Sequence, residues 1–339
     1  MMIAANEINK ILVINLAFIG DVILSIPLTR ALRDTYASAR ITMLTVPLTA
    51  PIAELNPFID EVRIYDKKGS HKGIIGGIEL IRELRNEKYD LAVCMNFAVR
   101  GAIVAWASGI KYRVGYDAQN AKWFLTHIAN SHRETITHET HNHLAVLNPL
   151  EIVAQDTSLS LKKKTDVQRK IMDLLSLSTS NPVGIICPIG SYPLKSLPTE
   201  KYIEIIKQLR SKADIYLIGS RTEKVILDQL AVEAGITSDR VLAGTLSLPE
   251  LVEFIRLAKF MITVDTGPLH IAQAVGTPVI AVFGPTDPRV WGPRGKNDVL
   301  IYEPVDCSPC WGRKECLEHQ CMMRIDSQKI VRAVEAILR

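Results

Sequence analysis

The chain has 339 residues, of which 47% are hydrophobic and 22% are charged, and its formal net charge is +4 at pH 7. This composition is typical of a folded globular protein and excludes a largely disordered chain. Two domains of similar size are expected, because a single hydrophobic core rarely grows to this length. The slight basic excess suits an anionic ligand or a membrane surface, but it is too small for a nucleic-acid-binding protein.

The opening stretch MMIAANEINKILVINL lacks a basic segment followed by an uninterrupted apolar run, so no signal peptide is expected. No apolar run in the sequence reaches the length of a membrane span. Cys94 and Cys187 lie within apolar, strand-like runs and are expected to be buried thiols in a reducing compartment. We therefore expect a cytoplasmic protein.

In the first part of the chain, short β-type runs alternate with longer helical runs. The elements predicted there are strands at 11–16, 40–46, 61–66 and 90–97, and helices at 20–37, 48–55 and 74–87. The strand runs are apolar on both faces, which is typical of a parallel sheet covered by helices on two sides. Between residues 116 and 180 the pattern is less regular, with a helix expected near 140–155.

The alternation resumes at residue 182. The elements predicted from there are strands at 182–188, 214–220, 261–264 and 278–284, helices at 199–211, 222–234 and 247–260, a helix that opens at Gly267, and an amphipathic helix at 325–339. Two such halves joined by a less regular segment predict an α/β protein of two Rossmann-like domains that face a central cleft. Ligands of such sheets bind at the carboxyl ends of the strands.

The stretch VDTGPLH, residues 264–270, follows one of the predicted strands. Its Asp-Thr-Gly also occurs in the catalytic loops of aspartic proteases. A pepsin-like protease needs two such loops in an all-β chain, and proteases that pair two chains are short and rich in strands. This chain has one copy in an α/β context, so we exclude a protease.

The same stretch has the features of an anion site at the start of a helix. Gly267 permits a tight turn, and Pro268 suits the first position of a helix. The unpaired N–H groups of that first turn, together with Thr266 and His270, could bind a diphosphate. Asp265 would cap the helix or bind a sugar hydroxyl, and a cap without any ligand is the alternative.

Two further loops follow predicted strands of the same half, so their side chains should converge on this helix start. The first loop carries Ser191 and Lys195, and Lys195 could contact a phosphate. The second carries Glu223, which could accept hydrogen bonds from both ribose hydroxyls. The alternatives are a solvated lysine and an acidic residue that stabilises the first turn of a helix.

The first half carries its own strand–turn–helix at Gly20 and Asp21. The dinucleotide motif G-x-G-x-x-G is absent there, so a dinucleotide is not the expected ligand. A carboxylate at this helix start is a candidate general base for an acceptor hydroxyl, because the helix end favours its ionised form. The alternative is again a helix cap.

Taken together, these motifs resemble glycosyltransferase family 9, the heptosyltransferases of lipopolysaccharide inner-core synthesis. The resemblance rests on FIGDVILSIPLTRAL, residues 18–32, and above all on VDTGPLHIAQAVGTPVIAVFGPTDP, residues 264–288. It implies a GT-B fold and an inverting, metal-independent transfer of heptose from ADP-heptose to a lipid-linked acceptor sugar. It also implies a cytoplasmic enzyme that contacts the inner membrane surface, without a required cofactor. A family member with another sugar donor, a nucleotide-sugar epimerase of similar architecture and a non-catalytic nucleotide-sugar-binding relative are the alternatives.

The resemblance also assigns roles to residues and domains. It implies that Asp21 is the catalytic base and that Leu246 lies where the backbone meets adenine. The implied donor contacts are Ser191, Lys195, Glu223, Leu246, Asp265, Thr266, Gly267 and His270, and the weaker acceptor-side candidates are Gly20, Arg100 and Arg113. The implied domains are an acceptor-binding domain at 1–165, a nucleotide-sugar-binding domain at 166–322 and a C-terminal helix at 323–339 that packs back toward the first domain. Where the family often has Arg-Trp-Pro after its lysine, this chain has Ser-Leu-Pro.

Three other clusters carry candidate functions. Four cysteines with the spacing C-x2-C-x5-C-x4-C are candidates for a structural zinc or iron–sulfur site, with free or oxidised thiols as the alternative: Cys307, Cys310, Cys316 and Cys321. The histidines of HETHNH, residues 138–143, lack the zincin spacing, so a polar helix start is predicted there. The lysines at 162–164 form a solvated turn or contact an anionic membrane.

Overall fold

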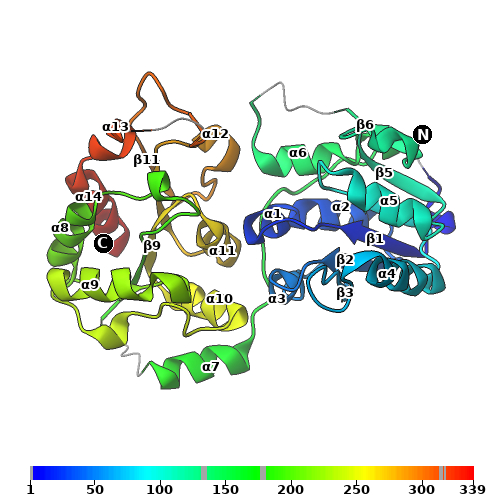
Figure 1. Cartoon of the computed structure of the whole chain (residues 1–339). Coiled ribbons are helices and arrows are strands. Elements are labelled where there is room, and N and C mark those ends of the chain that lie inside the picture. Colours follow the sequence, from blue (N-terminus) through cyan, green and yellow to red (C-terminus); the bar gives the residue numbers. More distant parts are fainter. Residues whose placement is uncertain (1–2, 131–135, 176–180, 313–315, 317) are drawn as a thin grey trace. The chain divides into compact units, whose positions relative to one another are not determined.

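The structure is a computed structural model that describes residues 3–130, 136–175, 181–312, 316 and 318–339 (Figure 1). The chain divides into two compact units, Met1–Lys162 and Lys163–Arg339. The division falls three residues before the boundary expected from the sequence.

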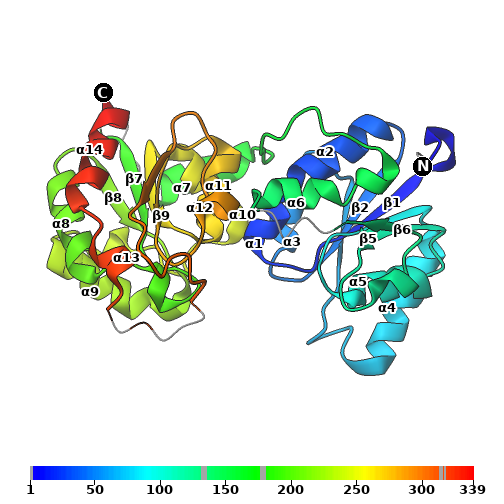
Figure 2. The ribbon, with the colours of Figure 1, turned by 90° about the horizontal axis from the view of Figure 1, so that it is seen from above.

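Parallel strands of the first unit form one sheet in the order β3-β2-β1-β4-β5-β6. The strands are β1 (Lys10–Ile14), β2 (Arg40–Thr45), β3 (Glu61–Ile64), β4 (Leu91–Cys94), β5 (Tyr112–Tyr116) and β6 (His127–Ala129). The helices are α1 (Ile19–Leu24), α2 (Ile26–Thr35), α3 (Ala50–Ala53), α4 (Gly73–Glu87), α5 (Val99–Ala107) and α6 (Glu139–Ala145). Figure 2 shows α1, α2 and α6 on one face of the sheet and α4 and α5 on the other. This is the classic doubly wound strand order.

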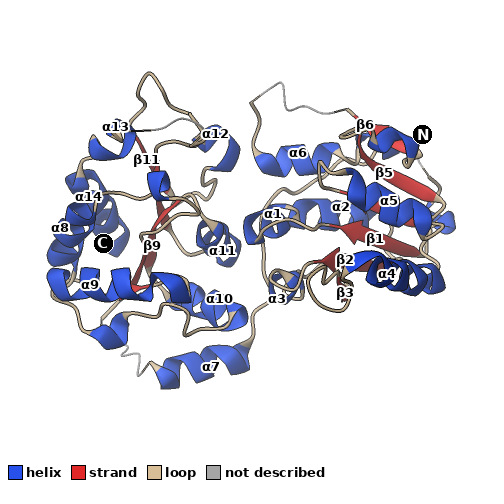
Figure 3. Cartoon of the chain, viewed as in Figure 1, coloured by secondary structure: helices blue, strands red, loops and turns tan. Residues whose placement is uncertain are grey.

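The second unit has the parallel order β11-β10-β9-β7-β8, which is the other common doubly wound order. Its strands are β7 (Val183–Cys187), β8 (Asp214–Leu217), β9 (Phe260–Val264), β10 (Val279–Phe283) and β11 (Val299–Tyr302). Its helices are α7 (Thr165–Leu174), α8 (Thr199–Leu209), α9 (Lys224–Ala234), α10 (Leu248–Leu257), α11 (Gly267–Val275), α12 (Pro288–Trp291), α13 (Gln320–Met323) and α14 (Ser327–Leu338). Figure 3 shows these helices around the strands.

The core of the second unit explains why β7 contains a glycine. The apolar side chains of α8, α9 and α14 pack on one face of the sheet together with those of the strands. On this face the buried ring of Phe260 in β9 lies over Gly184 in β7, where a Cβ atom would come 2.3 Å from the Phe260 Cζ atom. The glycine therefore gives the neighbouring ring room to lie flat on the sheet.

Helix α14 packs against α8 and against strands β9, β10 and β11. Its buried residues Ile330, Val331 and Val334 lie in the same core as those strands. The structure therefore assigns the C-terminal helix to the second unit rather than to a separate segment.

The structure corrects the single helix expected at 20–37. Two helices occupy this stretch, because α1 ends at Leu24 and α2 begins at Ile26. Pro27 has no N–H group and its ring clashes with the preceding turn, so one continuous helix cannot pass through it. The Ser25 hydroxyl donates a hydrogen bond to the Val22 carbonyl at 2.7 Å at this break. Seven further elements were not expected from the sequence: α5, β5, β6, α7, α12, α13 and β11.

None of the helices in the described parts of the chain is both long enough and apolar enough to cross a membrane. Cys94 and Cys187 are buried free thiols, as the sequence predicts. Burial raises the pKa of each thiol to about 12, so both stay protonated and unreactive near neutral pH.

Candidate functional site

The loop after β9 leads directly into α11, as the sequence predicts. Val264 ends the strand, and Thr266 is the extended N-cap residue, with a φ of −158°. Helix α11 begins at Gly267 with Pro268 as its second residue, one position later than expected for the proline. Of the two roles expected for Asp265, the cap is not seen, because Thr266 is the N-cap residue and the Asp265 carboxylate pairs with a lysine of another loop; the contact with a sugar hydroxyl stays a prediction.

That lysine is Lys195, from the loop after β7. Its Nζ atom lies 2.8 Å from the Asp265 Oδ2 atom and donates a second hydrogen bond to the Asp265 carbonyl at 3.2 Å. Only 12% of the Lys195 side chain and 8% of the Asp265 side chain are exposed. Strands β7 and β9 are neighbours at the point where the strand order of the sheet reverses, which is where doubly wound folds bind ligands. The pair therefore holds the Lys195 ammonium group, nearly buried and balanced by the Asp265 carboxylate, beside the start of α11.

The aromatic residue Tyr192 lies beside the same pair. The Lys195 Nζ atom is 5.0 Å from the centre of the Tyr192 ring, within the range of a cation–π contact. Burial, and next the charge of Asp265, raise the pKa of the Tyr192 hydroxyl to about 12. The Tyr192 side chain is therefore neutral, and its aromatic face lies against the Lys195 ammonium group.

His270 lies in the first turn of α11 and is 2% exposed. Its Nδ1 atom lies 3.1 Å from the Gln273 Oε1 atom, and its ring centre is 6.3 Å from the Trp291 ring of α12. These contacts fix the orientation of the imidazole. The position of His270 in the first turn was expected from the sequence, but the two neighbours that hold its ring were not.

The remaining donor candidates are Glu223, Ser191 and Leu246, of which Ser191 shares the loop of Lys195. Glu223 precedes α9, and its Oε2 atom accepts a hydrogen bond from the Ser220 N–H at 2.7 Å. The carboxylate therefore stabilises the start of a helix, which was the alternative to ribose binding. Ser191 is exposed and lines a cavity of about 340 Å³ beside α8 and α9. Leu246 is half-buried just before α10. The structure thus brings Lys195 into contact with Asp265, keeps Ser191 in the Lys195 loop, and places only Glu223 and Leu246 on other loops.

In the first unit, Asp21 is the third residue of α1, directly after β1. Its Oδ2 atom accepts a hydrogen bond from the Phe18 N–H at 3.3 Å, which is a helix-cap contact. The Leu16 N–H donates to the Asn96 Oδ1 atom at 2.7 Å and so joins the loop after β1 to the loop after β4. Strands β1 and β4 flank the point of order reversal in this sheet, so Asp21 lies at the ligand-binding edge of its unit.

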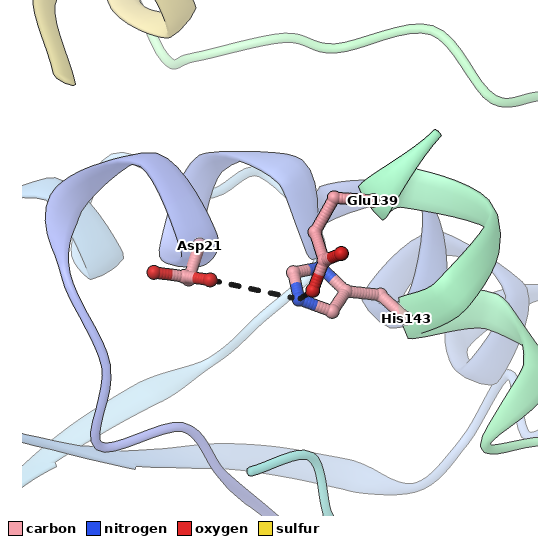
Figure 4. Close-up of side chains that lie close together, drawn as sticks. All are labelled: Asp21, Glu139 and His143. Carbon is pink, nitrogen blue, oxygen red and sulfur yellow. Dashed lines mark ion pairs between the residues drawn. The ribbon is translucent and has the colours of Figure 1, made fainter. Parts of the chain in front are cut away.

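Two side chains of α6 lie next to Asp21 (Figure 4). The His143 Nε2 atom is 4.0 Å from the Asp21 Oδ1 atom and 3.6 Å from the Glu139 Oε1 atom. Glu139 and His143 are each 5% exposed. The polar helix start expected here is confirmed, but the proximity of these side chains to Asp21 was not expected from the sequence. The four-residue spacing of Glu139 and His143 was an available signal, because it puts both side chains on one face of a helix.

The acceptor-side candidates have different surroundings. Gly20 is the second residue of α1, and Arg100, near the start of α5, lines a cavity of about 490 Å³. Arg113 lies in β5, where its guanidinium donates hydrogen bonds to the carbonyls of Ile110 and Phe124. This bonding gives Arg113 a structural role, whereas Arg100 keeps a position where a ligand could reach it.

The four clustered cysteines are free thiols. Burial, and next the other three cysteines, raise the pKa of Cys321 to about 11. The Cys316 Sγ atom accepts a hydrogen bond from the His319 N–H at 3.3 Å. Among the residues that the structure describes, no three cysteine sulfur atoms come within 4.8 Å of one another. Residues 313–315 and 317 of this segment lie outside the described ranges, so the metal site stays a prediction.

Comparisons with known proteins agree with the geometry. The model of glycosyltransferase family 9 (heptosyltransferase) matches residues 78–321. Lipopolysaccharide heptosyltransferase 3 of Escherichia coli (strain K12) is 28% identical over 294 residues, which cover 84% of this chain and 85% of that protein. A solved family 9 glycosyl transferase from Veillonella parvula DSM 2008 has a TM-score of 0.87 at 22% identity, covering 97% of each chain. The E. coli heptosyltransferase WaaC with ADP has a TM-score of 0.76 at 19% identity, covering 97% of this chain and 99% of that chain. These likenesses confirm the predicted α/β GT-B class of two Rossmann-like domains.

Proposed function

Since the chain belongs to glycosyltransferase family 9, we propose that this enzyme transfers heptose from ADP-heptose to a lipopolysaccharide inner-core acceptor, with inversion at the sugar carbon. The similar E. coli protein is named a lipopolysaccharide heptosyltransferase, and the similar WaaC structure contains ADP. The observation that carries the proposal is the Lys195–Asp265 pair at the start of α11, because it puts a nearly buried cation where a diphosphate would bind.

On the donor side, the charge that builds up on the departing diphosphate needs stabilisation. Lys195 and the unpaired N–H groups at the start of α11 supply positive charge at one place. Asp265 holds the Lys195 Nζ atom in position, and His270 adds a hydrogen-bonding group in the same turn. Preorganised groups of this kind lower the barrier by about 3 kcal/mol each. We assign no metal to the reaction, because these groups supply the charge that a metal would provide.

On the acceptor side, Asp21 takes the proton of the attacking hydroxyl. The hydroxyl oxygen forms the new bond to the sugar carbon from one face while the bond to the diphosphate breaks on the other. The sugar carbon thereby inverts, the proton ends on the Asp21 carboxylate, and ADP leaves with the electron pair of the broken bond. A carboxylate at a helix start stays ionised near neutral pH, which suits it to this role.

The donor assignment is tested by a thermal-shift panel of ADP, UDP, GDP and CDP. A ligand that binds only the folded protein raises its melting temperature, so ADP alone should do so. A second arm incubates the enzyme with ADP-heptose, with and without heptose-deficient lipopolysaccharide. If the heptose of ADP-heptose carries a radioactive label, that label should enter the lipid fraction only when the acceptor is present. Altered nucleotide sugar formed without an acceptor would instead identify an epimerase.

The acceptor is lipid-linked, so we also propose peripheral contact with the cytoplasmic face of the inner membrane. The start of α4 supports this, since Ile74 and Ile75 are 84% and 74% exposed. Lys68 and Lys72 lie on the surface just before them, and this mixture of basic and apolar groups suits an anionic bilayer. Vesicles with anionic lipids should sediment the enzyme, and Ile74→Glu with Ile75→Glu should reduce the bound fraction. Equal sedimentation of this variant would refute the contact.

The cysteine cluster is proposed as a structural zinc or iron–sulfur site, on the strength of its spacing. Elemental analysis of the purified enzyme should find about one equivalent of zinc, or several of iron. Metal-free protein whose four cluster cysteines all react with a thiol reagent after unfolding would exclude the site.

A further inference from the structure

The imidazole of His143 lies between two carboxylates that come from different helices. Glu139 is on its own helix, α6, and Asp21 is on α1, which packs against α6. The ligand atoms of the three side chains all lie within 4.8 Å of one another. Two of the three residues, Glu139 and His143, are almost fully buried, while 21% of the Asp21 side chain is exposed. Asp21 is therefore the member of this group whose side chain is accessible from outside the protein.

The distances show that the His143 Nε2 atom lies too far from either carboxylate to form a hydrogen bond. A hydrogen bond between nitrogen and oxygen needs about 2.7–3.2 Å, and the Nε2 atom is 3.6 Å from Glu139 and 4.0 Å from Asp21. One Nε2–H group can donate to only one carboxylate at a time. A shift of less than about 1 Å, which a rotamer adjustment provides, would complete the bond on either side.

Glu139 is held in place by a second contact. Its Oε2 atom accepts a hydrogen bond from the Asn142 side-chain amide at 2.9 Å, which leaves the Oε1 atom directed at His143. Within the described chain, the charged groups that face His143 are Asp21 from α1 and Glu139 from α6. Helix α2 also packs on α6, but no charged side chain of its described residues pairs with His143.

We propose that Glu139 and His143 are positioning residues that switch with the charge of Asp21 during transfer. Before transfer, the Nε2–H group of His143 donates to the ionised Asp21 carboxylate and orients it toward the acceptor. When Asp21 takes the acceptor proton it becomes neutral, and the Nε2–H group moves to Glu139. Proton release from Asp21 to solvent restores the first state. This inference rests on the proposed role of Asp21 as the base.

The test compares Glu139→Gln and His143→Gln with the matched control His141→Gln, an exposed histidine on the same helix. Without the Glu139 charge, the His143 N–H group has only the Asp21 carboxylate to bond. This bond favours the ionised form of Asp21, so Glu139→Gln should move the acid limb of the kcat–pH profile to lower pH. Removing His143 leaves Asp21 beside an uncompensated carboxylate and moves the acid limb to higher pH. Each variant should lose about tenfold in kcat, with the KM for ADP-heptose within about twofold of wild type.

Opposite shifts of the acid limb are the decisive result, because a merely structural role would not produce them. Shifts in the same direction, or unchanged limbs, would overturn the proposal. So would an activity that EDTA removes and divalent metal restores, since the cluster would then hold a cation. If His143→Gln does not fold, Glu139→Gln still tests the switch by the sign of its shift. Full activity of Asp21→Asn would instead refute the base, and with it the proposed function.

Discussion

Both units place a carboxylate at the edge where the strand order of the sheet reverses, yet the two carboxylates have very different partners. Asp265 in the second unit makes a direct 2.8 Å contact with a lysine, whereas Asp21 in the first unit lies 4.0 Å from a histidine. The lysine contact is a close, nearly buried ion pair, whereas the histidine contact is longer than a hydrogen bond. One unit thus holds its carboxylate in a tight ion pair, and the other leaves its carboxylate without a direct bond to the neighbouring histidine.

This difference separates two kinds of task. The Asp265 carboxylate is held by the Lys195 Nζ atom at 2.8 Å, and breaking this nearly buried ion pair would be costly. The Asp21 carboxylate has no such short contact with His143, whose Nε2 atom lies 4.0 Å away. The contrast therefore argues that Asp265 organises electrostatics for the donor and that Asp21 carries the proton transfer.

The largest expected effect comes from Asp21→Asn. The amide keeps the size of the side chain but cannot accept the acceptor proton, so kcat should fall by about a thousandfold. The affinity for ADP should stay within about twofold of wild type, because the proposed ADP contacts lie in the other unit. Turnover assays and calorimetry measure the two quantities. Turnover like that of wild type would remove the distinction between the two carboxylates.

A smaller but broader effect is expected from Lys195→Ala. It removes the proposed diphosphate contact and leaves the Asp265 charge nearly buried and unpaired. The Kd for ADP should rise by about tenfold to a hundredfold, and the folding stability should fall by about 3 kcal/mol. Calorimetry and denaturant unfolding measure these changes.

The control for this variant is the double change Lys195→Met with Asp265→Leu, which replaces the ion pair by apolar groups. Its stability should return close to that of wild type, while the affinity for ADP should stay weak. If affinity returned together with stability, Lys195 would act only through the fold.

The smallest effect is expected at an ion pair of the second unit that lies outside the proposed donor and acceptor contacts. Lys170 of α7 lies 2.6 Å from Glu250 of α10, and its hydrogen bond lowers the pKa of Glu250 from 4.5 to about 2. A lowered carboxyl pKa stabilises the fold above pH 4.5, and this contribution is lost as the pH falls from about 4.5 to about 2. Lys170→Met should therefore cost about 0.5 kcal/mol at pH 7 and nothing near pH 2.

Denaturant unfolding at several pH values measures this difference. A cost for Lys170→Met that is equal at pH 7 and pH 2 would mean that packing, not charge, joins α7 to α10. The modest size of the effect, set beside that of Lys195→Ala, would show how much more it costs to leave a buried charge unpaired than an exposed one.

Local features of the fold could be predicted from the sequence, and contacts between distant segments could not. The strand and helix around VDTGPLH were predictable because Gly267 and Pro268 act on their immediate neighbours. The pairing of Lys195 with Asp265 joins residues 70 positions apart, and no local pattern encodes it. The cap role of Asp265 was misassigned for the same reason.

The first unit shows the same division. Glu139 and His143 were visible as a polar helix start, but their contact with Asp21 depends on how α1 packs against α6. Strand β6 was missed because three residues, His127–Ala129, are too few to show a periodic pattern. The break at Pro27 could have been found, since proline inside a helical pattern predicts it.

The hydrogen bond from the Leu16 N–H to the Asn96 side chain sets a rule for redesigning this enzyme. It secures the backbone just before Asp21 by using a side chain of the neighbouring loop. The residues after Asn96 lead into α5 and line the cavity at Arg100. A chimera that takes its new loop from position 97 onward keeps this hydrogen bond to the backbone before Asp21, whereas one that also replaces Asn96 loses it.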